Sequence, residues 1–178
     1  MSTAASFQSF NGAVVVMGVA SCGKTTLGEA LAKTMQLPFV EGDKLHSAAN
    51  VAKMSSGNPL TDDDRWPWLQ QVGEALRGSK GVIASCSALK KSYRIAISAG
   101  AERSVIFIHL HGSELVLAKR IAARKGHFMP ASLLANQLAT LEIPDATELV
   151  LTIDVTLSPA RQLERAVNYL NGRLNLHG

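Results

Sequence analysis

The side chains with the clearest chemical role lie in a glycine-rich loop after the first apolar run. Residues 18–25 read Gly-Val-Ala-Ser-Cys-Gly-Lys-Thr and match the pattern G-x-x-x-x-G-K-[ST] at every fixed position. Backbone N–H groups of such a loop, with the N-terminus of the helix that follows, surround a phosphate group. The lysine then reaches the β- and γ-phosphates, and the threonine hydroxyl is a natural ligand for Mg²⁺. We therefore expect a nucleoside triphosphate, with Mg²⁺, to be bound by Gly18, Val19, Ala20, Ser21, Cys22, Gly23, Lys24, Thr25 and Thr26.

Two carboxylates, Glu41 and Asp43, follow the second apolar run. In an open parallel sheet, ligands bind at the carboxyl ends of the strands. Carboxylates two apart on an extended segment point the same way, so both could face the phosphate loop. One could then hold Mg²⁺ while the other accepts the proton of an attacking hydroxyl. An ordinary acidic turn after a strand is the alternative, and this feature alone does not decide between them.

Cations in two further segments indicate an anionic ligand. Arg65 follows Thr61 and three aspartates; it suits bidentate recognition of a carboxylate, although the aspartates equally suit the first turn of a capped helix. Lys90 and Lys91 fall near the N-terminus of a predicted helix, where cations are unfavourable unless an anion is close. Arg94 shares a helical face with Lys90 at the spacing i, i+4. Solvated surface lysines are the alternative.

A third basic segment contains Arg120, Arg124, Lys125 and His127. Basic residues near a helix C-terminus commonly interact with the helix dipole. A basic segment with a glycine could also close over ATP and stabilise charge during phosphoryl transfer. We therefore predict a lid at residues 124–130.

Short apolar runs alternate with segments of helical period along the whole chain. This alternation predicts a parallel sheet covered on both faces, and hence one three-layer α/β/α domain over residues 1–178. Residues 42–61 predict a short helix followed by a turn. The expected strands are 13–17, 38–40, 81–86, 104–110 and 149–153; the expected helices are 24–35, 62–76, 89–98, 114–124, 131–141 and 159–170.

Composition limits the class of protein. The 178 residues are 47% hydrophobic and 18% charged, which is typical of a compact globular chain. The net charge of +4 suits a site for polyanions, and no block of like charge indicates a nucleic-acid partner. Cys22 and Cys86 lack metal-ligand spacing. The first apolar run is too short to span a bilayer. We expect a cytoplasmic protein with neither a membrane nor a nucleic-acid partner.

Taken together, the motifs resemble those of the gluconate kinase family, which is grouped with the shikimate and nucleoside monophosphate kinases. The resemblance extends from Val14 to about Asp154. Besides the phosphate loop, it rests on five stretches: Glu-Gly-Asp-Lys-Leu-His at 41–46, Lys-Met-Ser-Ser-Gly-Asn-Pro-Leu-Thr-Asp-Asp-Asp-Arg at 53–65, Pro-Trp-Leu at 67–69, Cys-Ser-Ala-Leu-Lys-Lys with Tyr-Arg at 86–94, and Arg-Lys-Gly-His-Phe at 124–128.

The resemblance implies that MgATP phosphorylates the 6-hydroxyl of gluconate, in a homodimer. It implies catalytic roles for Lys24, Asp43 and Arg124, ATP contacts from Arg120 and Arg124, and Mg²⁺ contacts from Thr25 and Glu41. The substrate contacts that it implies are Asp43, His46, Arg65, Lys90, Arg94 and His127.

The phosphate loop departs from the family pattern at residues 20–22. Relatives usually carry Ser-Gly-Ser where this chain has Ala-Ser-Cys, and Ser21 costs more than glycine at a positive φ. Cys22 in an electropositive loop is hypothesised to have a lowered pKa and to be prone to oxidation. Two alternatives to a gluconate kinase remain at this point: a kinase of another hydroxy acid such as shikimate, and a non-catalytic nucleotide switch or nucleic-acid-associated ATPase.

Overall fold

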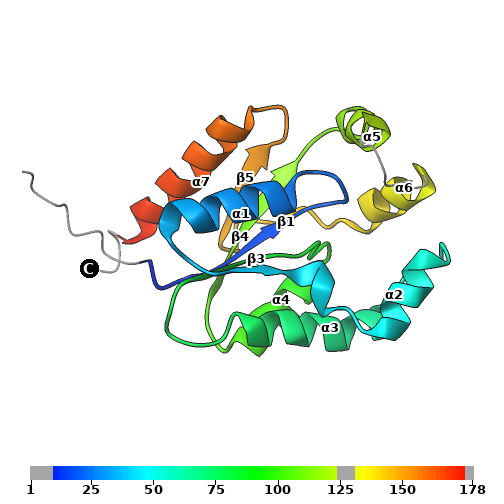
Figure 1. Ribbon diagram of the computed structural model, residues 1–178, viewed down its shortest axis with the longest axis horizontal. Coiled ribbons are helices and arrows are strands. Elements are labelled where there is room, and N and C mark those ends of the chain that lie inside the picture. Colours follow the sequence, from blue (N-terminus) through cyan, green and yellow to red (C-terminus); the bar gives the residue numbers. More distant parts are fainter. Residues whose placement is uncertain (1–9, 124–130, 175–178) are drawn as a thin grey trace, which may run out of the picture.

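A five-stranded parallel sheet forms the centre of the molecule, with strand order β2-β3-β1-β4-β5. The computed structural model describes residues 10–123 and 131–174, and helices cover both faces of the sheet (Figure 1). This architecture confirms the predicted three-layer α/β/α fold. The strands are β1 Ala13–Met17, β2 Phe39–Glu41, β3 Val82–Ser85, β4 Val105–His111 and β5 Val150–Asp154; the helices are α1 Lys24–Met35, the 3₁₀ helix η1 Gly42–Leu45, α2 Ala48–Ser55, α3 Asp62–Ala75, α4 Lys91–Ala101, α5 Glu114–Ala123, α6 Ala131–Thr140 and α7 Pro159–Leu174.

Strand β1 lies between β3 and β4 and is buried along its whole length. Val14 and Val16 pack into the core on the side of α1 and α7, whereas Val15 and Met17 pack on the side of α3 and α4. Figure 1 shows the two helical layers on opposite sides of the sheet. Burial of both faces explains why the strand is apolar at every position rather than at alternate ones.

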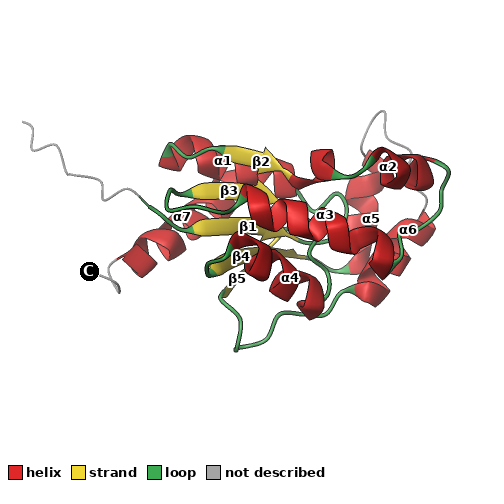
Figure 2. Cartoon of the chain, turned by 90° about the horizontal axis from the view of Figure 1, so that it is seen from below, coloured by secondary structure: helices red, strands yellow, loops and turns green. Residues whose placement is uncertain are grey.

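The strands point the same way, so their carboxyl ends meet at one edge of the sheet. The loop after β1, helix η1, and helices α2, α5 and α6 lie toward this edge in both views (Figures 1 and 2). This edge is where an open parallel sheet binds ligands. Within the described ranges, no helix is long and apolar enough to cross a membrane.

Helices α3 and α4 approach each other closely. A Cβ atom at Gly73 of α3 would lie 2.5 Å from the carbonyl oxygen of Ile97 in α4, so only glycine fits there. The N-terminal turns of the two helices also lie side by side, because the Tyr93 hydroxyl of α4 donates to the Asp62 carboxylate of α3.

Two local predictions that bear on the site were wrong. Helix α4 begins at Lys91 rather than at residue 89, because Lys90 is extended (φ −97°, ψ 151°) and Ala88 has a φ of 45°. The carboxylate of Glu142 caps this helix from another segment, since its Oε2 accepts the Lys91 N–H at 2.7 Å. Residues 42–45 form the 3₁₀ helix rather than an extended segment, so the alternation argument for Glu41 and Asp43 does not apply.

Candidate active site

The phosphate loop has the tight backbone that its glycines predict. Gly18 and Gly23 have φ angles of 142° and 103°. A Cβ atom at Gly18 would lie 2.8 Å from the carbonyl oxygen of Leu110, so the loop also needs this glycine for space. Ser21 does take a positive φ, 60°, which is the conformational cost expected from the sequence.

Two side chains reach over this loop. The Lys24 ammonium donates to the carbonyl oxygen of Val19 at 3.0 Å, so it lies across its own loop. Gln137 of α6 accepts the backbone N–H of Ala20 through Oε1 at 2.7 Å. The second contact brings α6, which is distant in sequence, against the phosphate loop. Gln137 was not predicted as a site residue, and no motif marks it.

Cys22 and Arg120 lie at the base of the loop. Cys22 is buried, and this burial raises the pKa of its thiol despite the opposing charges of Lys24 and Arg120. The hypothesis of a lowered pKa is therefore wrong, because desolvation outweighs the positive surroundings. Arg120 of α5 donates to the carbonyl oxygens of Cys22, at 3.5 Å, and of Val155. It thus joins the phosphate loop to the end of β5, beside the position predicted for ATP.

Three oxygen-bearing side chains meet at the ends of α1, β2 and β3. The Thr25 hydroxyl donates to Glu41 Oε2 at 2.6 Å, and the Ser85 hydroxyl donates to Glu41 Oε1. The Ser85 oxygen also accepts the backbone N–H of Gly42 at 3.3 Å. Hydroxyl and carboxylate oxygens are the hard ligands that Mg²⁺ takes in proteins, where phosphates and waters complete its shell. Ser85 was not predicted; a small polar residue at the end of an apolar strand is its only signal.

Asp43 lies on η1, which is held against α3 and β3. The Trp68 indole N–H donates to the Gly42 carbonyl oxygen at 2.8 Å, and a Cβ atom at Gly42 would collide with the carbonyl oxygen of Ser85. The His46 ring stacks on Trp68 with centroids 3.9 Å apart. Burial lowers the pKa of His46, although the nearby Asp43 charge opposes this shift. Asp43 itself is exposed, at the carboxyl edge of the sheet.

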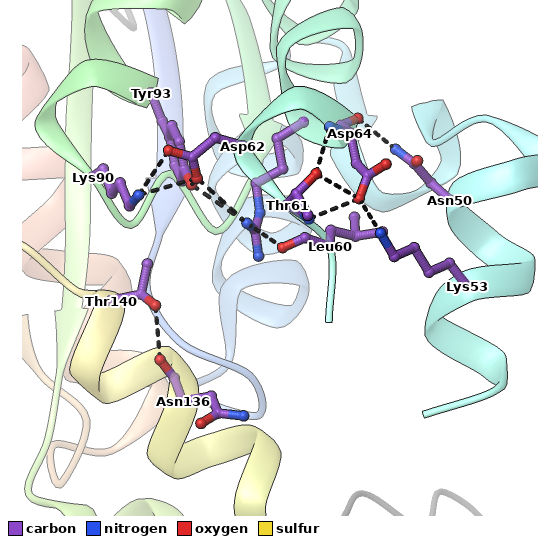
Figure 3. A network of polar contacts seen from close by, with 11 residues as sticks. Asn50, Lys53, Leu60, Thr61, Asp62, Asp64, Lys90, Tyr93, Asn136 and Thr140 are labelled. Carbon is purple, nitrogen blue, oxygen red and sulfur yellow. Dashed lines mark hydrogen bonds and ion pairs between the residues drawn. The ribbon is translucent and has the colours of Figure 1, made fainter. Parts of the chain in front are cut away.

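A cluster of two cations, a carboxylate and a phenol joins the N-terminal turns of α3 and α4 (Figure 3). The Lys90 ammonium lies 2.8 Å and 3.0 Å from the two carboxylate oxygens of Asp62. The Tyr93 hydroxyl donates to Asp62 Oδ1 at 2.5 Å, and Arg65 Nη1 lies 3.8 Å from the same oxygen. The structure therefore brings the two predicted cations, Arg65 and Lys90, together. Asp62 and Tyr93, which hold them, were not predicted as site residues.

Arg94 is not brought into this cluster. Its side chain is 2% exposed, and its Nε and Nη2 atoms donate to the Glu148 carboxylate at 2.5 Å and 3.0 Å. Its Nη1 donates to the carbonyl oxygens of Ala88 and Leu89. All three nitrogens thus have protein acceptors, and the surface lysine beside it, Lys91, pairs with Asp145 at 2.7 Å. The anions that the sequence indicated near this helix are in these cases carboxylates of the protein itself.

A second polar network fixes the start of α3. Thr61 is the N-cap of α3 and forms a capping box with Asp64, which agrees with the capped helix expected from the sequence. The Asp64 carboxylate also accepts from Lys53 at 2.6 Å, and this ammonium, followed by the bonds from Thr61, lowers the pKa of Asp64 to about 2. Asn50 donates to the Asp64 carbonyl oxygen at 2.8 Å, so α2 is tied to the same turn (Figure 3).

The remaining predicted site residues are Thr26, which is exposed on the first turn of α1, and Arg124 and His127. Arg124 and His127 lie outside the described residues, as does the whole predicted lid at 124–130.

Comparisons with known proteins agree with this geometry. A family model described as an AAA domain matches residues 14–144. A gluconokinase of Gluconobacter oxydans (strain 621H) is 45% identical over 160 residues, which cover 88% of this chain and 89% of that protein. The crystal structure of a gluconokinase from Sinorhizobium meliloti 1021 superimposes with a TM-score of 0.87 at 49% identity, covering 94% of this chain and 97% of that chain.

A comparison with a more distant structure shows which similarities reflect the fold alone. A shikimate kinase from Acinetobacter baumannii superimposes with a TM-score of 0.61 at 16% identity, over 94% of this chain and 97% of that chain. At that identity the likeness shows the shared kinase fold alone. The identity of about one half to the gluconokinases extends over nearly all of both chains, and on that ground this chain belongs to the gluconokinase family.

Proposed function

We propose that this chain transfers the γ-phosphoryl group of ATP to the 6-hydroxyl of D-gluconate. The observation that carries the proposal is the loop at residues 86–90. Its Ser87 carbonyl oxygen accepts the Gly18 N–H at 3.3 Å, which attaches it to the phosphate loop. Its other end is Lys90, in the cation cluster. One short segment thus joins a site suited to phosphates and a site suited to a carboxylate, as a kinase of a sugar acid requires.

On the nucleotide side, the backbone N–H groups of the phosphate loop and the Lys24 ammonium bind phosphate oxygens. Thr25 and Glu41 are the residues that would hold Mg²⁺, and Ser85 orients Glu41 through its hydroxyl. Bound Mg²⁺ would neutralise charge on the phosphates during transfer. Arg120, against the phosphate loop, adds positive charge to the same region.

On the acceptor side, Arg65 and Lys90 bind the carboxylate of the sugar acid. Asp43 accepts the proton of the attacking hydroxyl, and His46 donates or accepts a hydrogen bond to a neighbouring hydroxyl. Trp68 is a positioning residue, because it fixes η1 through Gly42 and supports the His46 ring. Arg94 is left out of the proposed substrate contacts, since its three nitrogens are engaged within the protein.

The two alternatives find less support. A shikimate kinase shares only the fold with this chain, at 16% identity. A nucleotide switch would have no use for the cation cluster or for the exposed carboxylate of Asp43 at the carboxyl edge of the sheet. The homodimer, the single domain with its lid, and the cytoplasmic location stay predictions.

A coupled assay of ADP release tests the proposal, with D-gluconate, shikimate, D-glucose and no acceptor compared at saturating MgATP. We expect gluconate alone to stimulate turnover. Asp43→Asn should reduce kcat with gluconate by about 10²–10⁴-fold, the usual contribution of a general base, while ATP still binds. Turnover that gluconate does not change would refute the acceptor, and an Asp43→Asn enzyme of normal kcat would refute the assigned base.

A further inference from the structure

Three ion pairs lie near the cation cluster. Asp64 is paired with Lys53, Lys91 with Asp145, and Arg94 with Glu148. These pairs are separate from the cluster and neutral as pairs. The cluster itself contains Arg65 and Lys90 against the single carboxylate of Asp62.

The cluster therefore has a residual charge of +1, from two cations and one anion. Asp62 shares its carboxylate between Lys90 and the Tyr93 hydroxyl, and the Lys90 ammonium lowers its pKa further below the usual range, so it stays ionised. Burial of Tyr93 and its bond to Asp62 raise the pKa of the phenol, so Tyr93 stays a neutral donor. Asp62 and Tyr93 thus keep these charge states at neutral pH.

The cluster also retains hydrogen-bond donors for a ligand. Arg65 uses Nη1 toward the Leu60 carbonyl oxygen, at 2.6 Å, and toward the Tyr93 hydroxyl, at 3.4 Å. Its Nε and Nη2 atoms have no acceptor among residues 10–123 and 131–174. The Nε–Nη2 edge of a guanidinium is the geometry that binds a carboxylate through two parallel hydrogen bonds. Arg65 Cζ and Lys90 Nζ lie 5.6 Å and 5.4 Å from the centroid of the Tyr93 ring, so both cations contact the same phenol.

We propose that Asp62 is a specificity-determining residue, which sets the charge of this site at +1 and so selects a singly charged acid head group over neutral and doubly charged ones. The inference rests on the proposed function, because it assumes that this cluster faces the acid end of the substrate. A neutral polyol would leave the Arg65 edge without an anion. A phosphate dianion would exceed the charge that the cluster can neutralise.

The test compares three ligands of equal chain length that differ at the first carbon: D-glucitol (neutral), D-gluconate (one negative charge) and D-glucitol 1-phosphate (two negative charges). Their dissociation constants are measured by calorimetry with the wild-type protein, Asp62→Asn and Asp63→Asn. Asparagine keeps the shape and an acceptor for Lys90 and Tyr93, so the change is one of charge. Asp63→Asn is the matched control, since it removes the same charge from the same helical turn but lies outside the cluster.

Asp62→Asn raises the residual charge of the cluster to +2. The additional positive charge attracts glucitol 1-phosphate, which has two negative charges, more strongly than gluconate, which has one. We expect the affinity for glucitol 1-phosphate, divided by the affinity for gluconate, to rise about tenfold in this variant. This factor lies between the values that the Coulomb energy of one charge pair gives in water and in a protein interior. Asp63→Asn should leave the ratio as in the wild type. Steric effects of the phosphate cancel, because each ligand is compared between variants.

An equal ratio in Asp62→Asn and Asp63→Asn overturns the inference, provided that the wild-type protein phosphorylates gluconate. If the wild type neither binds nor phosphorylates gluconate, the proposed function fails, and the inference fails with it. Thermal unfolding of each variant shows whether it is folded, and the same ratio measured for Asp62→Ala provides a second reading if Asp62→Asn proves unstable.

Discussion

Acid should destabilise this protein through one buried histidine, His109 on β4. Its side chain is 1% exposed on the face covered by α3 and α4, and neither ring nitrogen has a hydrogen-bond partner within the described residues. Desolvation, followed by the charges of His111 and Arg94, lowers the pKa of His109 from 6.5 to about 4. The folded protein therefore holds this ring neutral, whereas the unfolded chain binds a proton below about pH 6.5.

The sign and size of the effect follow from the two pKa values. Because the folded pKa is the lower one, the contribution to stability is full above about pH 6.5 and is lost as the pH falls toward 4. Between pH 7 and pH 5 the linkage relation gives a loss of about 2 kcal/mol in the free energy of unfolding from this residue.

Urea unfolding at pH 7 and pH 5 measures this loss, with His109→Leu as the test variant. Leucine fills a similar volume and removes an unsatisfied polar ring from the core. Every other titrating group is common to the two proteins, so the difference between their pH dependences isolates His109. We expect the wild type to lose about 2 kcal/mol more than the variant on acidification. Parallel pH dependences, or a ring that titrates near pH 6.5 by NMR in the folded protein, would refute the reasoning.

Two further substitutions test how the site is supported. Ser85→Ala removes the hydroxyl that holds Glu41, so the apparent Mg²⁺ requirement in the ADP assay should rise about three- to tenfold, the worth of one hydrogen bond; an unchanged Mg²⁺ dependence would leave Ser85 a purely structural role. Glu148→Gln leaves the buried Arg94 guanidinium without its counter-charge and should lower the free energy of unfolding in urea by about 3 kcal/mol. Asp145→Asn, which breaks an exposed pair with Lys91, is the matched control and should cost far less; equal losses would contradict the buried pairing.

Much of the fold could be predicted from local patterns in the sequence. The bounds of β1 and α1 agree with the prediction at both ends, because an apolar run, glycine-rich loop and helical period mark each boundary. The capped start of α3 at Thr61, with aspartates in its first turn, could be predicted for the same reason, since these residues are adjacent in the sequence. The start of α4 could not be predicted from local sequence, because the Glu142 carboxylate that caps this helix lies 51 residues further along the chain.

The candidate site shows the same division. The phosphate loop is a contiguous motif, so its residues could be identified from spacing alone. The role of Arg94 could not be identified in this way. Helical spacing places Arg94 beside Lys90, but its buried guanidinium pairs with Glu148, which is distant in sequence. Asp62 was interpreted as a helix-dipole residue, which its position in the first turn of α3 supports. The contacts of Asp62 with Lys90 and Tyr93 could not be predicted, because they form only through the close packing of α3 against α4.

The most direct test of the central claim is the identity of the product. The wild-type protein is incubated with MgATP and D-gluconate, and the product is examined by phosphorus and proton NMR. We expect one phosphoryl group whose phosphorus couples to the two protons on carbon 6 of gluconate. A phosphoryl group on another oxygen, or hydrolysis of ATP with gluconate unchanged, would contradict it.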